Sequence, residues 1–535
     1  MISQRGFNGL LFFSLAAAVC LAGCTDSDQP AENPIPGPTA TENHVDQNTS
    51  TPTHVEKQKT KSAPKLKPLL AGWEKPAVAI VFSGEQHGYL EPCGCTETQS
   101  GGISRRADLF RQIEDKGWPV TAFDLGGSLK RTRRQSLLKF ETLMTALADM
   151  KYAGMAVGPE ELRMGTDVFL SLFNPNPENP NITPSFLAAN ITFYETEELG
   201  RLKWKTITVG KIKIAVTAIF GESYRKEVEG SGGQATFKIE KPIEALPAVL
   251  EKIKAEKPDL TILLAHAEKD ESRALIKQFP EFDLVLTAGG PEDPIGQIEL
   301  VEKTVMVEVG HKGKYAGVIG FYPENKEQKL KFELVDLDKY RFKDTDKMVE
   351  HMRFYQDRLK EEALAAESPI DHPSGANFVG AETCGQCHTK AYAKWKKTRH
   401  AHATDSLLNA KFGLTETIIS RMFDPECLAC HVTGWDAKQA LRYNSGFLNA
   451  EFAKTAEEKS LSNLLQGQQC ENCHGPGSKH IQLVNEGNLA AAKKLTHIDL
   501  ATAKQNVCYK CHDLDNSPKF NFETYWEKIK HPGLD

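Results

Sequence analysis

Residues 384–400 read CGQCHTKAYAKWKKTRH, and the spacing of the first five letters returns three more times in the last third of the chain. Each copy reads C-x-x-C-H, which is the attachment pattern of c-type haem. The two thiols lie about one helical turn apart, so they can add to the two vinyl groups of one porphyrin while the histidine reaches its iron. Zinc ribbons use cysteine pairs without a histidine at a fixed place. The predicted attachment residues are Cys384, Cys387 and His388; Cys427, Cys430 and His431; Cys470, Cys473 and His474; and Cys508, Cys511 and His512.

The second axial ligand decides what each of the four predicted haems can do. The only methionine after residue 375 is Met422, so at most one iron can have a methionine ligand. Histidines are more plentiful, and two of them on one iron give a low potential and no open site. We therefore expect mostly bis-histidine haems, which suit electron transfer. The spare histidines are His400, His402, His480, His497 and His531.

The flanks of these motifs, over about residues 378–532, resemble the tetrahaem cytochrome c-554-like family. The similarity lies in CGQCHTKAYAKWKKTRHAHA, in CENCHGPGSKH and in CHDLDNSPKFNFETYWEKIKH. It implies that His400, His480 and His531 are distal iron ligands and that redox proteins are the partners. The family often leaves one haem five-coordinate, and CLACHVTGW has no obvious partner. His402, His497 and His372 stay open, each as the missing ligand or as a surface histidine.

A chain of 535 residues is too long for one hydrophobic core, so we expect two domains. The predicted division is a helical linker at 342–375 between an α/β domain at 74–341 and a mostly α multihaem domain at 376–535. Short helices at 382–397 and 460–466 are expected to wrap stacked haems. The net charge of −6 is spread over both signs, which argues against a nucleic-acid partner.

Short apolar runs alternate with amphipathic stretches from about residue 75 to 340, which is typical of a layered α/β domain. Strands are predicted at 77–83, 121–125, 155–157, 212–219, 260–265 and 284–288, and helices at 105–115, 137–150, 242–257 and 271–279. Three more strands, at 304–309, 316–322 and 329–337, follow without helices between them. A helix is also predicted at 344–367, where it docks one domain on the other.

This domain resembles the calcineurin-like metallophosphatase domain of periplasmic 5′-nucleotidases. The similarity runs through VFSGEQHGYLEP, GGISRRADL, FDLGG, VGPEE, LAHAEKD, TAGGPED and VGHKGKYAGVIGFY. His87 and His266 stand at family ligand positions, and Glu85 replaces an Asp. The other ligands are replaced by Gly127, Pro159, Glu160, Gly289 and Pro291. A two-metal hydrolytic site needs a bridging carboxylate, so we do not expect conventional phosphoesterase activity.

Two cysteines enter this domain where the usual ligands are lost. Glu85, His87, Cys93, Cys95 and His266 form a mixed set of ligand types that favours one zinc or copper ion as a second metal site. Glu160 is a further candidate for this set. The alternatives are a redox-active thiol pair, a readily reduced Cys93–Cys95 disulfide, or two structural cysteines.

The N-terminus has the features of a bacterial export signal. Arg5 precedes an apolar run at 10–22 that is too short to span a bilayer comfortably. Residues 21–24, LAGC, resemble a lipoprotein signal, which implies a lipid on Cys24; the alternative is an ordinary signal cleaved elsewhere. Residues 25–67 contain almost no large apolar side chain, and a disordered tether is predicted over 25–73. We therefore expect a lipid-anchored protein on the periplasmic or cell-surface side of a bacterial membrane.

These observations favour an exported multihaem cytochrome that transfers electrons. In this interpretation the metallophosphatase-like domain is non-hydrolytic and binds a partner, a substrate or a metal. One rival is an oxidoreductase that acts on a small nitrogen or sulfur compound at an open haem or at Cys93 and Cys95. The second rival is a residual metal-dependent phosphoesterase. The sequence leaves open whether the protein is an enzyme and what its oligomeric state is.

Overall fold

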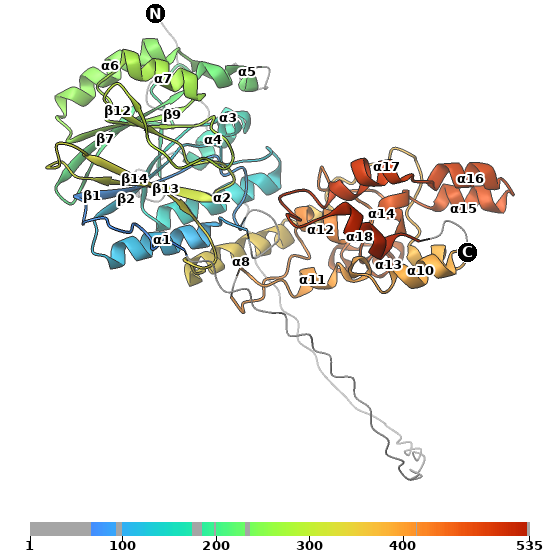
Figure 1. Cartoon of the computed structure of the whole chain (residues 1–535). Coiled ribbons are helices and arrows are strands. Elements are labelled where there is room, and N and C mark those ends of the chain that lie inside the picture. Colours follow the sequence, from blue (N-terminus) through green and yellow to red (C-terminus); the bar gives the residue numbers. More distant parts are fainter. Residues whose placement is uncertain are drawn as a thin grey trace, which may run out of the picture. The chain divides into compact units, whose positions relative to one another are not determined.

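The computed structural model describes residues 66–92, 99–173, 184–196, 199–229, 236–413 and 415–531. The described residues all belong to one compact unit. An α/β region comes first along this unit, and a region of short helices follows it (Figure 1). Cys24, Cys93 and Cys95 lie outside the described residues, as do the predicted signal and nearly all of the tether.

The α/β region contains two six-stranded sheets. The first sheet has the order β14-β13-β1-β2-β3-β4, in which β1 to β4 are parallel and β13 and β14 are antiparallel. Its strands are β1 (Val78–Ser83), β2 (Val120–Asp124), β3 (Tyr152–Ala156), β4 (Ser185–Leu187), β13 (Tyr315–Phe321) and β14 (Leu330–Asp336). The late antiparallel pair agrees with the prediction of terminal strands that have no helix between them.

The second sheet has the order β11-β12-β10-β9-β7-β6, with parallel strands in the middle and antiparallel strands at both edges. Its strands are β6 (Trp204–Val209), β7 (Ile212–Phe220), β9 (Leu260–His266), β10 (Leu284–Thr287), β11 (Glu299–Val301) and β12 (Thr304–Val307). A separate small pair joins β5 (Ile191–Phe193) to β8 (Phe237–Ile239).

Alternation along the strands sets the layers, because successive side chains point to opposite faces. In β1, Ile80 and Phe82 face the core between the two sheets, whereas Val81 faces the helices outside the first sheet. In β9, Leu264 faces the same inter-sheet core and Leu263 faces the helices outside the second sheet. The architecture is therefore helix, sheet, sheet, helix, and the α/β class predicted for this region is confirmed.

Amphipathic helices cover the outer face of each sheet. The first sheet is covered by α1 (Ile103–Asp115), α2 (Arg134–Asp149) and α8 (Asp346–Glu361), and the second by α6 (Pro242–Ala255) and α7 (Lys269–Gln278). Shorter helices, α3 (Pro159–Arg163), α4 (Thr166–Phe173) and α5 (Arg225–Val228), lie in the connections. The predicted long helices therefore exist, with ends shifted by a few residues.

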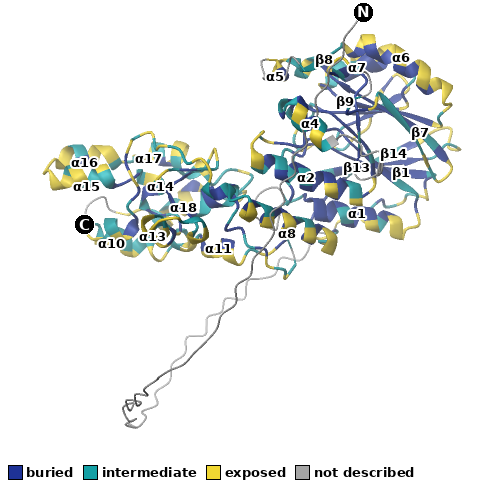
Figure 2. Cartoon of the chain, turned by 180° about the vertical axis from the view of Figure 1, so that it is seen from behind, coloured by how far each residue is buried: buried dark blue, intermediate teal, exposed yellow. Residues whose placement is uncertain are grey.

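The C-terminal region is built from short helices, most of them shorter than ten residues. They are α9 (Ala381–Gly385), α10 (Thr389–Trp395), α11 (Asp405–Leu408), α12 (Pro425–His431), α13 (Ala456–Leu464), α14 (Cys470–His474), α15 (Ser478–Asn485), α16 (Leu489–Thr496), α17 (Leu500–Thr502) and α18 (Phe522–Ile529). The one two-stranded sheet among its described residues is β15 (Trp435–Asp436) with β16 (Leu441–Arg442). Figure 2 shows more intermediate and exposed residues here than in the α/β core.

The single helix predicted at 382–397 is wrong in detail, because the chain forms two helices, α9 and α10. His388 separates them with a non-helical backbone (φ −100°, ψ 61°). Its N–H still donates to the carbonyl of Cys384 at 2.9 Å, so the motif itself is one closed turn. The turn that brings His388 back beside the two thiols therefore ends the first helix.

The core outside the first sheet extends into the C-terminal region. Met352, Tyr355 and Leu359 of α8 belong to this core, and so do Phe412 and Ile419 from the segment before α12. The helix predicted to dock the two regions is therefore packed on the α/β side, and the C-terminal segment packs into the same cluster.

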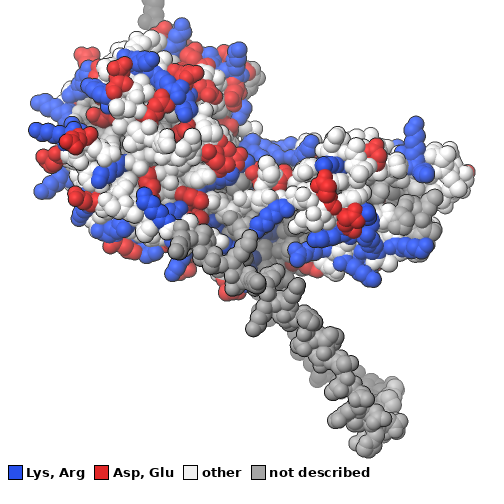
Figure 3. All heavy atoms as spheres, viewed as in Figure 1, with Lys and Arg blue, Asp and Glu red and all other residues white. Residues whose placement is uncertain are grey.

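Charged side chains of both signs are interspersed over the face of the α/β region seen in Figure 3. Among the residues that the structure describes, no helix is both long and apolar enough to cross a bilayer.

Replacing Phe412 by Ala tests this shared core. Phe412 is 2% exposed, so the loss of its ring should lower the free energy of unfolding by about 3 kcal/mol or more. Phe354→Ala on α8 is the control, because that ring is 60% exposed. Urea unfolding of both variants measures the difference, and an equal effect of the two changes would contradict the shared core.

Candidate functional site

The first candidate site lies in loops that follow strands of the two sheets. Glu85 and His87 follow β1, His266 ends β9, and His311 follows β12. Glu85 and His87 both have a left-handed backbone, with φ of 45° and 47°. Such conformations cost free energy in residues other than glycine, and they are enriched at functional sites.

Glu85 and His311 form an ion pair, with Nε2 of His311 3.2 Å from the carboxylate. Burial alone would raise the pKa of Glu85, but the ion pair with His311 and the charges of nearby histidines lower it below its usual value. The same ion pair raises the pKa of His311. The ring of His87 lies edge-on to that of His311 at 5.4 Å, and burial lowers the pKa of His87. The geometry therefore favours a charged Glu85–His311 pair beside a neutral His87.

His266 is held in one tautomer by the backbone. Its Nδ1 lies 2.7 Å from the carbonyl oxygen of Leu125, which can only accept, so Nδ1 carries the proton. The ring fits because glycines stand opposite it. A Cβ at Gly158 would lie 2.8 Å from Cε1 of His266, and one at Gly127 would lie 3.4 Å from the same atom. Gly127 is the residue that the sequence analysis predicts at the place of a bridging Asp.

A buried carboxylate accepts hydrogen bonds from the backbone N–H groups around these glycines. Glu161 is fully buried and accepts hydrogen bonds from the N–H groups of Gly127 (3.1 Å), Ser128 (2.8 Å) and Gly158 (2.9 Å). It therefore binds protein N–H groups at the turn. The sequence reasoning missed both Glu161 and His311, although each lies inside a quoted motif, VGPEE and VGHKGKY.

Among the described residues, there is no group of three or more His, Cys, Asp or Glu side chains that could hold a metal ion. Glu85 is engaged by His311, and His266 has one nitrogen bonded to the backbone. The zinc or copper prediction depends on Cys93 and Cys95, which lie outside the described residues. We therefore derive no metal-dependent step at this site.

The second candidate site is the set of C-x-x-C-H motifs, whose cysteines are all free thiols. The first motif spans α9 and the turn before α10, and the second and third end α12 and α14. The fourth begins with a 3-10 turn at Cys508–Lys510. The thiols of Cys384 and Cys470 lie within hydrogen-bonding reach of one another, as do those of Cys430 and Cys511. The first motif therefore lies against the third, and the second against the fourth.

Three histidine pairs have the separation that a shared metal ion requires. A metal–nitrogen bond is about 2 Å long, so two imidazoles on one ion have ring centres about 6 Å apart. The observed ring centres are 6.2 Å apart for His388 and His480, 5.9 Å for His512 and His400, and 6.0 Å for His474 and His531.

Hydrogen bonds turn the second nitrogen of several of these rings toward the shared position. Nδ1 lies 2.7 Å from the carbonyl of Thr496 in His474, 3.0 Å from that of Ala492 in His480, and 3.1 Å from that of Ile529 in His531. A carbonyl accepts only, so Nδ1 is protonated and Nε2 is free to bind a metal. Burial also lowers the pKa of His400, to about 4, which keeps that imidazole in its neutral, metal-binding form.

His431 of the second motif differs from these pairs. Its Nδ1 donates to the carbonyl of Ala403 at 2.9 Å and lies 3.0 Å from the hydroxyl of Ser406, so its Nε2 is also free. Within the part of the chain that the structure describes, no second imidazole stacks near it. His402 lies instead 3.4 Å from Asp405, and His372 packs against Tyr443.

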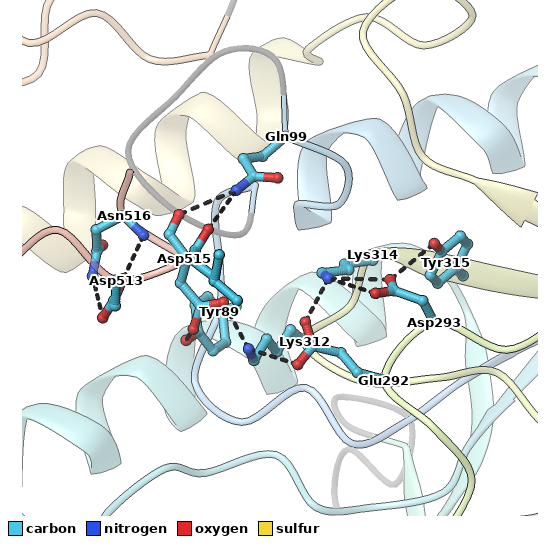
Figure 4. A network of polar contacts seen from close by, with 11 residues as sticks. Tyr89, Gln99, Glu292, Asp293, Lys312, Lys314, Tyr315, Asp513, Asp515 and Asn516 are labelled. Carbon is cyan, nitrogen blue, oxygen red and sulfur yellow. Dashed lines mark hydrogen bonds and ion pairs between the residues drawn. The ribbon is translucent and has the colours of Figure 1, made fainter. Parts of the chain in front are cut away.

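The two candidate sites are joined by polar contacts (Figure 4). Asp515, three residues after His512, accepts a hydrogen bond from the hydroxyl of Tyr89 at 2.7 Å. Lys312, next to His311, lies 2.7 Å from the same carboxylate and 2.8 Å from Glu292. The loop that carries Glu85 and His87 is therefore in direct contact with the end of the fourth motif.

Comparison with known proteins assigns the C-terminal region. Residues 383–475 match the family model of cytochrome c554 and c-prime. Cytochrome c-554 from Nitrosomonas europaea is 29% identical over 189 residues, which cover 32% of this chain and 66% of that protein. The predicted relationship of the C-terminal region to cytochrome c-554 is confirmed, and haem c is the cofactor that the relationship implies.

The α/β region is similar to solved phosphoesterase structures. The 5′-nucleotidase precursor from Thermus thermophilus has a TM-score of 0.47 and 16% identity, and covers 55% of this chain and 60% of its own. Sulfate thiohydrolase SoxB from the same genus and species has a TM-score of 0.45 and 14% identity, over 56% and 63%. The calcineurin-like phosphoesterase YfkN from Bacillus subtilis has a TM-score of 0.43 and 14% identity, over 53% and 98%.

Replacing Glu161 by Ala tests the buried turn. Three backbone N–H groups would lose their acceptor, which should lower the free energy of unfolding by about 3 kcal/mol or more. Glu161→Gln keeps an oxygen for Gly127 and Gly158, so its loss should be smaller. Urea unfolding ranks the two variants, and equal effects would contradict the assigned hydrogen bonds.

Glu160, one residue earlier, gives a pH-dependent prediction. Burial and the neighbouring Glu161 raise its pKa from 4.5 to about 7. Its folded form therefore binds more protons than the unfolded form between these values, and stability falls as pH rises through this window. Glu160→Gln should remove that loss and be more stable than the native protein by up to about 3 kcal/mol above pH 7. Thermal unfolding at about pH 5 and pH 8 measures it, and a constant difference would contradict it.

Proposed function

We propose that the protein is an exported, lipid-anchored cytochrome that carries four covalently bound haems and transfers electrons between redox partner proteins. The single observation that carries the proposal is the set of three histidine pairs with ring centres 5.9 to 6.2 Å apart, each containing the histidine of one C-x-x-C-H motif. Haem iron, when bound, accepts and releases one electron.

The chain's own residues have separate tasks in this proposal. The cysteine pairs attach the haems, and the axial pairs are His388 with His480, His474 with His531, and His512 with His400. A six-coordinate iron has no site for substrate, which suits electron transfer. The thiol contacts between motifs support close packing of neighbouring haems, with Cys384 beside Cys470 and Cys430 beside Cys511.

A second candidate function is supported by His431. Because this imidazole has no histidine opposite it among the described residues, the second haem is the one with an open axial position. In this alternative, a small nitrogen or sulfur compound binds there, and the bis-histidine haems carry the electrons.

The α/β region has a non-hydrolytic role in both proposals. Gly127 stands where a bridging carboxylate would be needed, and the nearby Glu161 binds backbone N–H groups. We propose that this region binds the c554-like region and a partner or substrate. Export and the lipid anchor rest on residues 1–24, which end in LAGC.

Spectroscopy of histidine variants tests the electron-transfer proposal. His400→Ala, His480→Ala and His531→Ala should each convert one low-spin haem to a high-spin haem, since each change removes one axial ligand. Mass spectrometry of the native protein should give four haems per chain. The spin states are measured by electron paramagnetic resonance of the oxidised protein.

His402→Ala is the matched control, because His402 lies two residues after His400 and its side chain is 65% exposed. It should leave every spin state unchanged. Low-spin spectra that persist in all three test variants would overturn the assigned ligands. Binding of carbon monoxide or cyanide to one haem in the native protein would favour the oxidoreductase, and its absence would exclude an open haem.

A further inference from the structure

The second haem motif begins at a contact between the two regions. Helix α12, which carries Cys427, Cys430 and His431, is capped by Asp424, whose side chain accepts from the N–H of Glu426 at 3.0 Å. Glu426 directly precedes Cys427. The first turn of this helix therefore places a carboxylate beside the first thiol of the motif.

Helix α2 of the α/β region supplies the opposite charge. Nζ of Lys139 lies 2.5 Å from the carboxylate of Glu426, and Arg131 lies 3.5 Å from the same group. The Lys139 side chain is only 16% exposed. Burial alone would lower the pKa of Lys139, but Glu426 and Asp424 raise it above its usual value, so the ammonium group stays charged.

Further polar contacts surround this ion pair. Asp424 accepts from Gln135 of α2 at 2.7 Å and from Gln356 of α8 at 2.9 Å. Arg421, which is 6% exposed, pairs with Glu91 of the loop after β1 at 2.7 Å. The start of α12 is thus held beside Lys139 by contacts with α2, α8 and this loop.

We propose that Lys139 is a positioning residue through which the α/β region sets the electron affinity of the haem at the second motif. The inference rests on the proposed function, since it requires a haem on Cys427 and Cys430. Charge and burial around a haem are among the factors that set its potential. The ion pair keeps Glu426 neutralised beside that haem, and the α/β region is the source of the cation.

Opposite single substitutions should therefore shift the potential in opposite directions. Lys139→Met leaves Glu426 with the more distant Arg131, at 3.5 Å, as its counter-ion; the less neutralised anion stabilises the oxidised iron and lowers the potential. Glu426→Gln leaves an unpaired cation, which raises it. The double variant removes both charges, so its haem potential should lie near the native value. Lys139→Arg keeps the positive charge and should also have a near-native potential.

The experiment is a redox titration of the full chain with dithionite and mediators, in which all haems are followed by electron paramagnetic resonance and the second haem is followed by its own signal, whether high-spin or low-spin. Each single variant is expected to change the ratio of reduced to oxidised haem at least tenfold at a fixed potential, which corresponds to about 59 mV for one electron. The matched control is Lys254→Met, which breaks a 2.8 Å ion pair with Glu281 on the far face of the α/β region; it should cause no shift.

Four haems per chain with unshifted potentials would overturn this inference and leave the proposed function standing. Shifts of both single variants in the same direction would also overturn it, because loosened packing would then be the cause. Absence of haem from the second motif in the native protein, measured by mass spectrometry of the peptide with Cys427 and Cys430, would instead overturn the proposed function.

Discussion

Two imidazoles that share one iron must keep their ring centres about 6 Å apart, and three histidine pairs of the C-terminal region have this separation. Each pair joins residues that are remote in sequence: His388 with His480, His474 with His531, and His512 with His400. Short helices can bring such pairs together, because each helix positions only one motif or one histidine. A conventional core remains mainly around the second motif, where Leu428 and Val432 are buried.

In the α/β region, the polar groups of the loops that follow the strands bind one another. Glycine at 127 and 158 makes room for the ring of His266, and the buried carboxylate of Glu161 binds the N–H groups around them. Glu85, in turn, is paired with His311. These contacts stabilise the loops after the strands, and the same loops then meet the c554-like region through Tyr89 and Lys312.

The α/β region and the C-terminal region are in direct contact. They share a hydrophobic core at the segment before α12, and Lys139 pairs with Glu426 next to Cys427. Charges held at a mostly buried contact are weakly screened by salt. The α/β region therefore sets part of the electrostatic field at the start of α12.

Much of the candidate site could be predicted from the sequence, because the motifs depend on local spacing. The C-x-x-C-H motifs, the candidate ligands His400, His480 and His531, and the alternation of strands and helices are all short-range patterns. The helix predicted at 382–397 failed because a turn at residues 386–388, which ends in the non-helical His388, interrupts it. His311 and Glu161 were missed because their roles depend on partners that no spacing rule connects to them.

The sequence by itself determined the sheet-and-helix class of the α/β region and predicted which residues attach haem, since side-chain alternation and thiol spacing act over a few residues. Only the tertiary structure decided which histidine faces which, that His431 has no imidazole opposite it among the described residues, and that Lys139 meets Glu426. These contacts form only when segments up to about three hundred residues apart in the sequence come together. The packing of the whole chain decides which segments meet.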